Sequence, residues 1–177
     1  MQIREAKLSD AAGIAKVHVD SWRTTYKGII PDEYLNNLSC AQRAELWDKN
    51  ISKPDSYVIV AENDDGEIIG FADAWKRDNN KEDKAIDLTS IYLLEDYQGK
   101  GVGKQLLKAL FDYFKNAGYE TVYVEVLEDN KTKFFYEYYG AEFLKTVQIK
   151  IASETLNESI YVWRDVEMAL RKININK

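Results

Sequence analysis

The chain has 177 residues, of which 45% are hydrophobic and 31% are charged, a composition typical of one globular domain large enough to bury a core. Its formal net charge of −6 disfavours general binding to nucleic acid, and its single cysteine and single histidine exclude an internal disulfide and a cysteine-rich or multi-histidine metal centre. No apolar run approaches the ~20 residues of a membrane span, and Met1–Ala6 lacks the apolar stretch of a signal peptide. We therefore expect a cytoplasmic protein with no metal and with no nucleic-acid or membrane partner.

The first half of the chain predicts a strand, three helices and a β-hairpin. Alternating residues predict the strand at 2–6, and Ser9-Asp10 is typical of the start of a helix that carries apolar residues as far as Trp22. The turn signal Asn63–Gly66 joins two apolar strands into the hairpin. The other predicted ranges are 31–38 for a short helix, 39 onward for a helix capped by Ser39, 56–62 and 67–75 for the hairpin strands, 77–84 for a charged loop and 85–93 for a strand.

The second half alternates helices and strands. An amphipathic helix follows a glycine-rich segment, carries Leu106, Leu107 and Phe111 on its apolar face, and ends at Gly118. The remaining predicted ranges are 121–127 for a strand, 129–139 for a shorter helix, 142–151 and 159–168 for two final strands, and 171–177 for a polar tail that we expect to fray. This order predicts a mixed α/β sheet and not a regular doubly wound one.

The segment Tyr97–Lys104 is the most informative part of the chain. It carries three glycines at alternate positions, follows an apolar strand and opens the amphipathic helix. Such a loop leaves backbone N–H groups uncovered, and the start of the helix adds partial positive charge at the same place. The segment therefore predicts a binding site for phosphate or pyrophosphate.

Two familiar phosphate-binding loops fit this segment poorly. The loop of nucleoside triphosphatases requires G-x-x-x-x-G-K-[ST]. Gly103-Lys104 supplies its end, but Gln98 replaces the first glycine and Gln105 replaces the hydroxyl residue that binds magnesium. The dinucleotide fingerprint G-x-G-x-x-G is expected after the first strand, whereas this segment reads G-x-G-x-G and lies late in the chain.

A third pattern, Q/R-x-x-G-x-G/A, is matched without a miss by Gln98, Gly101 and Gly103. The match follows the apolar segment Ile91–Leu94, and a second motif lies downstream. That second motif consists of Asn130, Phe135-Tyr136-Glu137 and Gly140-Ala141-Glu142-Phe143. With both motifs, and over about residues 1–170, the chain resembles the GNAT superfamily of acetyl-CoA-dependent N-acetyltransferases.

The resemblance implies an α/β (mixed α+β) fold with a central, mostly antiparallel sheet of about seven strands, flanked by helices and splayed between strands 4 and 5. It implies a single N-acetyltransferase domain over residues 1–177, and a possible homodimer. The implied activity is transfer of an acetyl group from acetyl-CoA to a primary amine of a small molecule or a protein. Two alternatives stay open: a non-catalytic acyl-CoA-binding regulatory protein, and a nucleotide-binding protein that uses Gly103-Lys104.

The resemblance also implies where coenzyme A binds. The pyrophosphate is expected on the N–H groups of the glycine loop, because glycine lets the backbone approach without interference from a Cβ atom. The splayed strand before the loop is expected to hold the pantetheine arm and to offer an N–H to the oxyanion. The expected cofactor-binding residues are Ile91, Tyr92, Leu93, Gln98, Gly99, Lys100, Gly101, Val102, Gly103, Lys104, Asn130 and Tyr136. Whether Lys100 and Lys104 contact phosphate through their side chains stays open.

Acyl transfer to an amine requires groups that move protons. Tyr136 matches the tyrosine that donates a proton to the departing sulfur in this family, and a phenol suits that task. For the general base we expect Asp87, since a carboxylate in an apolar strand has a raised pKa. Glu125 on the neighbouring strand is a rival, and an amine acceptor of modest pKa needs no dedicated base.

The acceptor pocket is expected at the connection between the early helices. Trp22 and Tyr26 are the expected substrate-binding residues, because aromatic rings bind ammonium groups through cation–π contacts. The same two rings are also suited to plain packing of the helix onto the sheet. His18 and Cys40 are expected to be structural.

Overall fold

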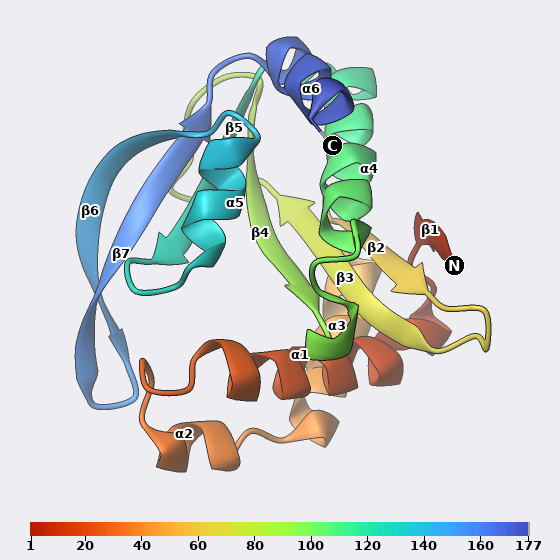
Figure 1. Cartoon of the computed structure of the whole chain (residues 1–177), viewed down its shortest axis with the longest axis vertical. Helices are drawn as coiled ribbons and strands as arrows, with labels where there is room; N and C mark the ends of the chain where they lie inside the picture. The colour runs from red at the N-terminus through yellow and green to blue at the C-terminus, as the bar shows by residue number, and fades with distance from the viewer. Residues whose placement is uncertain (177) are drawn as a thin grey trace.

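The computed structural model describes residues 1–176. Seven strands form one sheet in the order β1-β2-β3-β4-β5-β7-β6 (Figure 1). The strands are β1 (Gln2–Glu5), β2 (Tyr57–Glu62), β3 (Ile68–Trp75), β4 (Ala85–Leu93), β5 (Thr121–Leu127), β6 (Glu142–Ile151) and β7 (Glu154–Trp163). Only β4 and β5 pair in parallel, and the other neighbours are antiparallel. The mostly antiparallel mixed sheet predicted from the sequence is confirmed.

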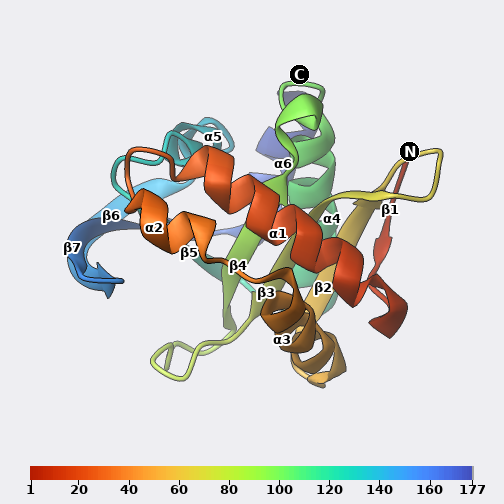
Figure 2. The ribbon, with the colours of Figure 1, turned by 90° about the horizontal axis from the view of Figure 1, so that it is seen from below.

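Helices cover both faces of the sheet, as the view from below shows (Figure 2). One face carries α1 (Ala11–Thr25), α2 (Asp32–Asn36) and α3 (Cys40–Ser52), and the other carries α4 (Val102–Asn116), α5 (Thr132–Tyr138) and α6 (Val166–Ile175). Short 3-10 turns at Leu8–Asp10 and Glu95–Tyr97 precede α1 and α4. The hydroxyl of Ser39 accepts from the N–H of Gln42, so the cap predicted for α3 is confirmed.

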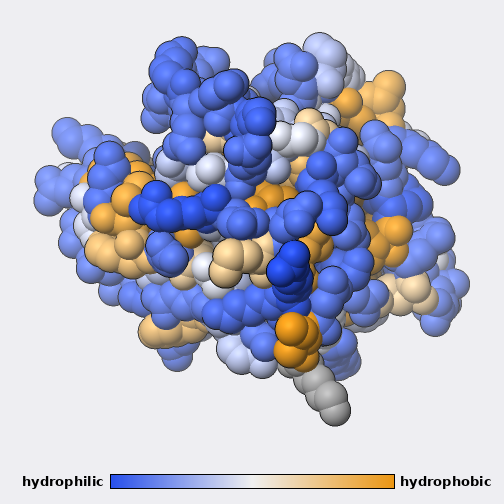
Figure 3. Space-filling model, turned by 90° about the horizontal axis from the view of Figure 1, so that it is seen from above, coloured by the Kyte–Doolittle hydropathy of each residue, from blue (hydrophilic) through white to orange (hydrophobic). Residues whose placement is uncertain are grey.

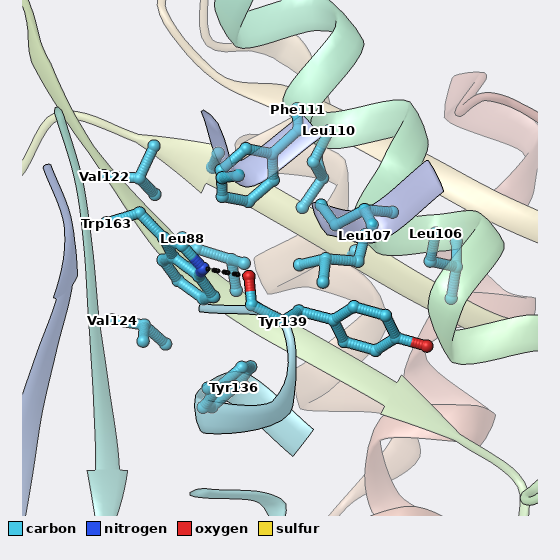
Figure 4. Packing of buried hydrophobic residues seen from close by; sticks show 14 of the residues in the cluster. Leu88, Leu106, Leu107, Leu110, Phe111, Val122, Val124, Tyr136, Tyr139 and Trp163 are labelled. Carbon is cyan, nitrogen blue, oxygen red and sulfur yellow. Dashed lines mark hydrogen bonds between the residues drawn. The ribbon is translucent and has the colours of Figure 1, made fainter. Parts of the chain in front are cut away.

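The main core lies between the sheet and α4. Figure 4 shows side chains of α4 facing side chains of β4, β5 and β7. Trp163 is buried beside Phe111, with ring centroids 5.1 Å apart, and its indole N–H donates to the carbonyl of Tyr139 at 3.0 Å. That hydrogen bond satisfies the buried indole and ties β7 to the end of α5, which fixes α5 beside the split of the sheet.

The sheet splits between β4 and β5. Residues Ala85–Leu88 pair with Thr121–Val124, and beyond Leu88 the two strands separate, as Figure 1 shows at their lower ends. The register between β3 and β4 shifts at the same place, so that Thr89 is an extra residue, and its hydroxyl donates to the carbonyl of Asp73 at 3.0 Å. A bulge bends its strand, so this one turns β4 away from β5 and produces the predicted splay.

The end of the chain differs from the sequence prediction. The last strand spans Glu154–Trp163 and not 159–168, and residues 171–175 continue α6 and do not form a frayed tail. The Asp165 side chain caps α6 by accepting from the N–H of Met168, which turns the chain out of the sheet. Figure 3 shows a mainly hydrophilic face here, with apolar side chains in separate groups, because α6 turns its apolar side toward the core. Lys177 lies outside the described residues.

Two isoleucines of α6 provide a matched test of this packing. Ile173 is fully buried against the core and Ile175 is 78% exposed. We expect Ile173→Ala to lower the free energy of unfolding by about 2–5 kcal/mol, because it leaves a cavity, and Ile175→Ala to change it by less than about 0.5 kcal/mol. Urea denaturation of both variants measures the difference, and equal small effects would mean that α6 does not pack.

Candidate active site

A groove of about 1040 Å³ runs from the glycine-rich loop to the split in the sheet. Its walls come from the loop, the open end of β4, the C-terminal end of α1 and the start of α5. Predicted residues that line it are Ile91, Tyr92, Leu93, Gln98, Gly99, Gly101, Gly103, Lys104 and Asn130. Nine of the twelve residues expected to bind the cofactor therefore lie together along one surface.

The glycine-rich loop turns its backbone toward this groove. Gly99 and Gly101 have φ of 70° and 81°, a left-handed conformation that side chains other than glycine rarely adopt. A Cβ atom at either position would meet nothing within 4 Å, so conformation and not space requires these glycines. α4 begins at Val102, and the N–H groups of its first turn have no acceptor within the helix. Gly101, Gly103 and Lys104 line the groove, so the positive end of the helix dipole lies at its loop end.

The lysines around the groove differ in where their ammonium groups lie. Lys104 lines the groove, and its ammonium group donates to the backbone carbonyl of Asn176. The Lys100 ammonium group lies 5.6 Å from the centre of the Tyr97 ring, away from the groove wall. Lys27 and Lys131, which the motifs did not point to, line the groove instead. The groove is thus lined by three lysines, and Glu95 and Asp129 line it as well.

The open edge of β4 presents peptide groups to the groove. The N–H of Leu94 donates to a carbonyl of β3 at 3.0 Å, so the alternate residues Ile91 and Leu93 turn their peptide groups toward the split. The carbonyl of Leu93 accepts from the Ser21 hydroxyl at 3.1 Å and the Gln98 amide at 3.3 Å. The peptide groups of Ile91 face the split without a strand partner within residues 1–176.

A second cavity, of about 180 Å³, opens from the inner end of the groove, and we call it the gap cavity. It shares four lining residues with the groove: Ile91, Tyr92, Asn130 and Thr132. Tyr136, Trp22 and Tyr26 line it together with Ser90, Arg77, Glu125 and Glu158. The groove and the gap cavity therefore form one continuous passage through the split in the sheet.

Tyr136 is held at the inner side of the gap cavity by α5. Its ring is buried against Trp163, with centroids 5.8 Å apart, and burial raises the pKa of its hydroxyl. The hydroxyl therefore stays protonated at neutral pH and can donate a proton. Asn130 positions α5, because its side-chain oxygen accepts from the N–H of Thr132 at 2.9 Å in the turn that opens the helix.

Three acidic side chains lie near the split, and they differ in their partners. Glu125 on β5 forms an ion pair with the guanidinium of Arg77. Glu158 on β7 is half-buried beside this pair, and burial, followed by the negative charge of Glu125, raises its pKa to about 7. Asp73 on β3 is buried beneath Thr89, and burial raises its pKa to about 6, but it does not line the gap cavity.

Asp87, the expected general base, lies outside both the groove and the gap cavity. Its carboxylate accepts from the backbone N–H of Arg77 at 3.0 Å and from the side chain of Asn80 at 2.9 Å. These bonds anchor the loop between β3 and β4, and that loop carries Arg77 to Glu125. The structure thus gives Asp87 a role in holding the loop and does not bring it to the site.

The aromatic residues at the end of α1 line the gap cavity as expected. The hydroxyl oxygens of Tyr26 and Tyr92 lie 2.8 Å apart. The Trp22 ring packs edge-on against the Tyr26 ring, with the two ring centroids 4.8 Å apart. The guanidinium of Arg43 lies 5.9 Å from the centre of the Trp22 ring, so a cation already occupies one side of it. Both expected roles of these rings, packing and lining the pocket, are thus compatible with the structure.

His18 and Cys40 lie away from both cavities. The Nδ1 of His18 accepts from the Trp47 indole at 3.0 Å, and burial lowers the pKa of His18 to about 3, which keeps it neutral. Cys40 is exposed at the start of α3. Across residues 1–176, no three His, Cys, Asp or Glu side chains gather as metal ligands, and no helix is long and apolar enough to cross a membrane.

A split sheet with a glycine-rich loop and a passage through the split is the arrangement of an acyltransferase. The model of the acetyltransferase (GNAT) family matches residues 19–140, so the chain belongs to this family. It is 37% identical over 172 residues, 97% of this chain and 98% of the relative, to the uncharacterized N-acetyltransferase YuaI of Bacillus subtilis (strain 168).

Two solved structures share the fold. The PaiA N-acetyltransferase from Thermoplasma acidophilum, solved in complex with coenzyme A, matches with a TM-score of 0.72 and 24% identity over 89% of this chain and 96% of that one. The yncA protein from Salmonella typhimurium, solved with its cofactor acetyl-CoA, matches with a TM-score of 0.71 and 18% identity over 92% of each chain. Both likenesses concern the fold alone.

Proposed function

We propose that residues 1–177 act as one N-acetyltransferase domain that transfers an acetyl group from acetyl-CoA to a primary amine of a small molecule or a protein. The observation that carries the proposal is the continuous passage from the glycine-rich loop through the split. A phosphate-binding loop end, an open strand edge and a proton donor follow one another along it. That sequence of features matches a long acyl carrier with phosphates at one end and a thioester at the other.

Each part of the passage has a chemical task in this proposal. The N–H groups at Gly101 and the start of α4 bind the pyrophosphate, with Lys27, Lys104 and Lys131 adding positive charge. The open edge of β4 binds the pantetheine arm in the manner of an added strand. Acetyl-CoA supplies the acetyl group as a thioester, and the N–H of Ile91 donates to the carbonyl oxygen that gains charge during attack.

Tyr136 completes the proton balance at the reacting carbon. When the amine attacks, the carbon–nitrogen bond forms and the carbon–sulfur bond breaks, so the sulfur leaves with an electron pair. The Tyr136 hydroxyl gives its proton to that sulfur, and the resulting phenolate takes the proton that the new amide nitrogen loses. Burial raises the pKa of the hydroxyl, so it is uncharged at neutral pH and gives up its proton only when negative charge develops on the sulfur beside it.

Two measurements on the purified chain test the proposal. Calorimetry with coenzyme A should register binding, and thiol release from acetyl-CoA should depend on an added primary amine. Binding without turnover across a broad panel of small amines and peptides would favour a non-catalytic acyl-CoA sensor. Thermal protection by ATP and magnesium, but not by coenzyme A, would favour a nucleotide-binding protein and contradict the proposal.

A further inference from the structure

Glu158 is a carboxylate of the gap cavity that no cation neutralises. It lies on β7, opposite Leu127 of β5 and Val147 of β6, with its side chain at the wall of the gap cavity. The nearby guanidinium of Arg77 is already paired with Glu125. Of the lysines and arginines in residues 1–176, none lies within 4 Å of the Glu158 carboxylate. When Glu158 ionises, the cavity therefore holds one excess negative charge.

The groups around Glu158 act on its ionisation in opposite directions. From β5, Glu125 repels a second negative charge and raises the pKa, and Arg77 from the loop before β4 lowers it. From the residue that follows α1, the Tyr26 hydroxyl faces the same space, and burial raises its pKa, so it adds no charge at neutral pH. From β6, the exposed Lys145 occupies a register position diagonal to Glu158. Burial outweighs these charges and raises the pKa of Glu158 to about 7.

We propose that Glu158 takes the proton that the acceptor's ammonium group must lose before attack, and that the acceptor is accordingly an aliphatic primary amine that enters as a cation. The proposal rests on the proposed function and assigns its general base and acceptor class. The ammonium transfers one proton to the carboxylate, which gives a neutral amine and a neutral carboxylic acid. The amine then attacks the thioester, and Glu158 releases its proton to solvent after the product leaves.

The other two carboxylates are poorly placed for this step. Asp87 lies outside the gap cavity and holds the loop through two hydrogen bonds. Glu125 lines the cavity, but its carboxylate is paired with the guanidinium of Arg77 and is not free to bind the acceptor's ammonium group. A general base works best when its pKa lies near the working pH, and among these three only Glu158 combines that property with a place in the cavity wall.

The shape and charge of the cavity narrow the acceptor further. About 180 Å³ bounded by Trp22, Tyr26 and Tyr92 admits a slim chain and not a bulky ring system. The excess negative charge repels an acceptor with a carboxylate next to its amine, since Arg77 is not free to compensate it. We therefore expect unbranched alkylamines and diamines, or an unbranched side-chain amine, to be preferred over α-amino groups of free amino acids.

Glu158→Gln in the full chain tests the assignment. Glu158→Gln keeps the size of the side chain and removes its charge. Glu158→Asp restores an ionisable group at the same position. Glu154→Gln, at the exposed start of the same strand, is the control. For wild type, kcat/KM with an alkylamine should rise with pH and level off at about 7. For Glu158→Gln, kcat/KM at pH 7 should be about 10²–10⁴-fold lower than for wild type. With increasing pH, kcat/KM of the variant should show no plateau at 7 and should rise until the pH reaches the pKa of the amine itself. Glu158→Asp should regain the plateau, and Glu154→Gln should match wild type.

Two further readouts separate this proposal from a structural role and from failure of the cofactor site. A fluorinated primary amine is mostly uncharged at pH 7, so no proton has to be removed from it before attack. With this amine, kcat/KM of Glu158→Gln should be less than about 10-fold below that of wild type. Calorimetry with coenzyme A should give the same affinity for wild type and Glu158→Gln. An unchanged pH profile in Glu158→Gln, or equal losses with both amines, would overturn the role of Glu158.

Carbon-13 NMR of labelled glutamate side chains makes the test independent of the acceptor. The resonance missing from Glu158→Gln identifies the residue, and we expect it to titrate near pH 7 in wild type. Titration near the ordinary value of about 4.3 would overturn the proposal. Coenzyme A binding with no turnover of any alkylamine would overturn the acceptor class, whereas absence of coenzyme A binding would instead contradict the proposed function.

Discussion

Tyr136→Phe is expected to lower kcat by about 10²–10⁴-fold without changing the dissociation constant of coenzyme A. The change removes only the hydroxyl from the gap cavity, so the departing sulfur loses its proton donor. Each tenfold loss corresponds to about 1.4 kcal/mol of the activation barrier. Steady-state measurement of thiol release, together with calorimetry, separates turnover from cofactor affinity.

The neighbouring residue Tyr138 supplies the control for this prediction. It lies two positions along the same helix and is 52% exposed, so Tyr138→Phe removes an equivalent hydroxyl far from the reacting atoms. The ring of Tyr136 keeps its packing on Trp163 in the phenylalanine variant, and thermal melts of both variants should match wild type. Unchanged turnover in a folded Tyr136→Phe protein would mean that another group protonates the sulfur.

The cofactor side of the site could be predicted from the sequence because it is local. Phosphate binding requires bare backbone N–H groups at a helix start, and Gly101 and Gly103 lie at the start of α4, whereas the N–H of Gln98 donates to the carbonyl of Glu95. The splay of the sheet was implied by the family resemblance and follows physically from the extra residue Thr89 in β4. In both cases the structural cause lies within one short stretch of chain.

The acidic side of the site could not be predicted because it depends on distant segments. Asp87 lies in an apolar strand and Glu158 lies between Asn157 and Ser159, and nothing local to either residue shows which of them reaches the site. Their roles differ because Asn80 and the N–H of Arg77 bind Asp87, whereas Glu158 comes next to Glu125 only through the pairing of β7 with β5. Strand order, which the sequence does not display, decides which carboxylate reaches the cavity.

The C-terminal error had a different cause. The turn between β6 and β7 is built at Ala152-Ser153 and contains no glycine or asparagine, with Ala152 at a φ of 56°. The start of β7 therefore carried no turn signal, and the strand was predicted too late. The apolar residues of α6 have helical spacing in the sequence, and Asp165 is a suitable N-cap immediately before them. These two features together predict the helix. The apolar positions are Val166, Ala169, Leu170 and Ile173.

Gly101→Val is expected to weaken coenzyme A binding by about 10-fold or more. Gly101 sits immediately before α4 at a φ of 81°, and a β-branched residue there costs about 1–2 kcal/mol in the left-handed conformation. The loop then relaxes toward another conformation, and its N–H groups no longer converge on one anion. Calorimetric titration with coenzyme A measures the loss, where about 1.4 kcal/mol corresponds to each factor of ten.

Gly66→Val is the control that separates an effect on coenzyme A binding from a general loss of stability. Gly66 has nearly the same conformation, with a φ of 82° in the turn between β2 and β3, and a Cβ atom would meet nothing within 4 Å at either glycine. Gly66→Val should therefore lower the free energy of unfolding by a similar amount and leave coenzyme A affinity unchanged, because Gly66 does not line the groove. Equal loss of affinity in both variants would mean that general destabilisation, and not the loop backbone, controls binding. A loss confined to Gly101→Val ties affinity to the direction of the loop N–H groups.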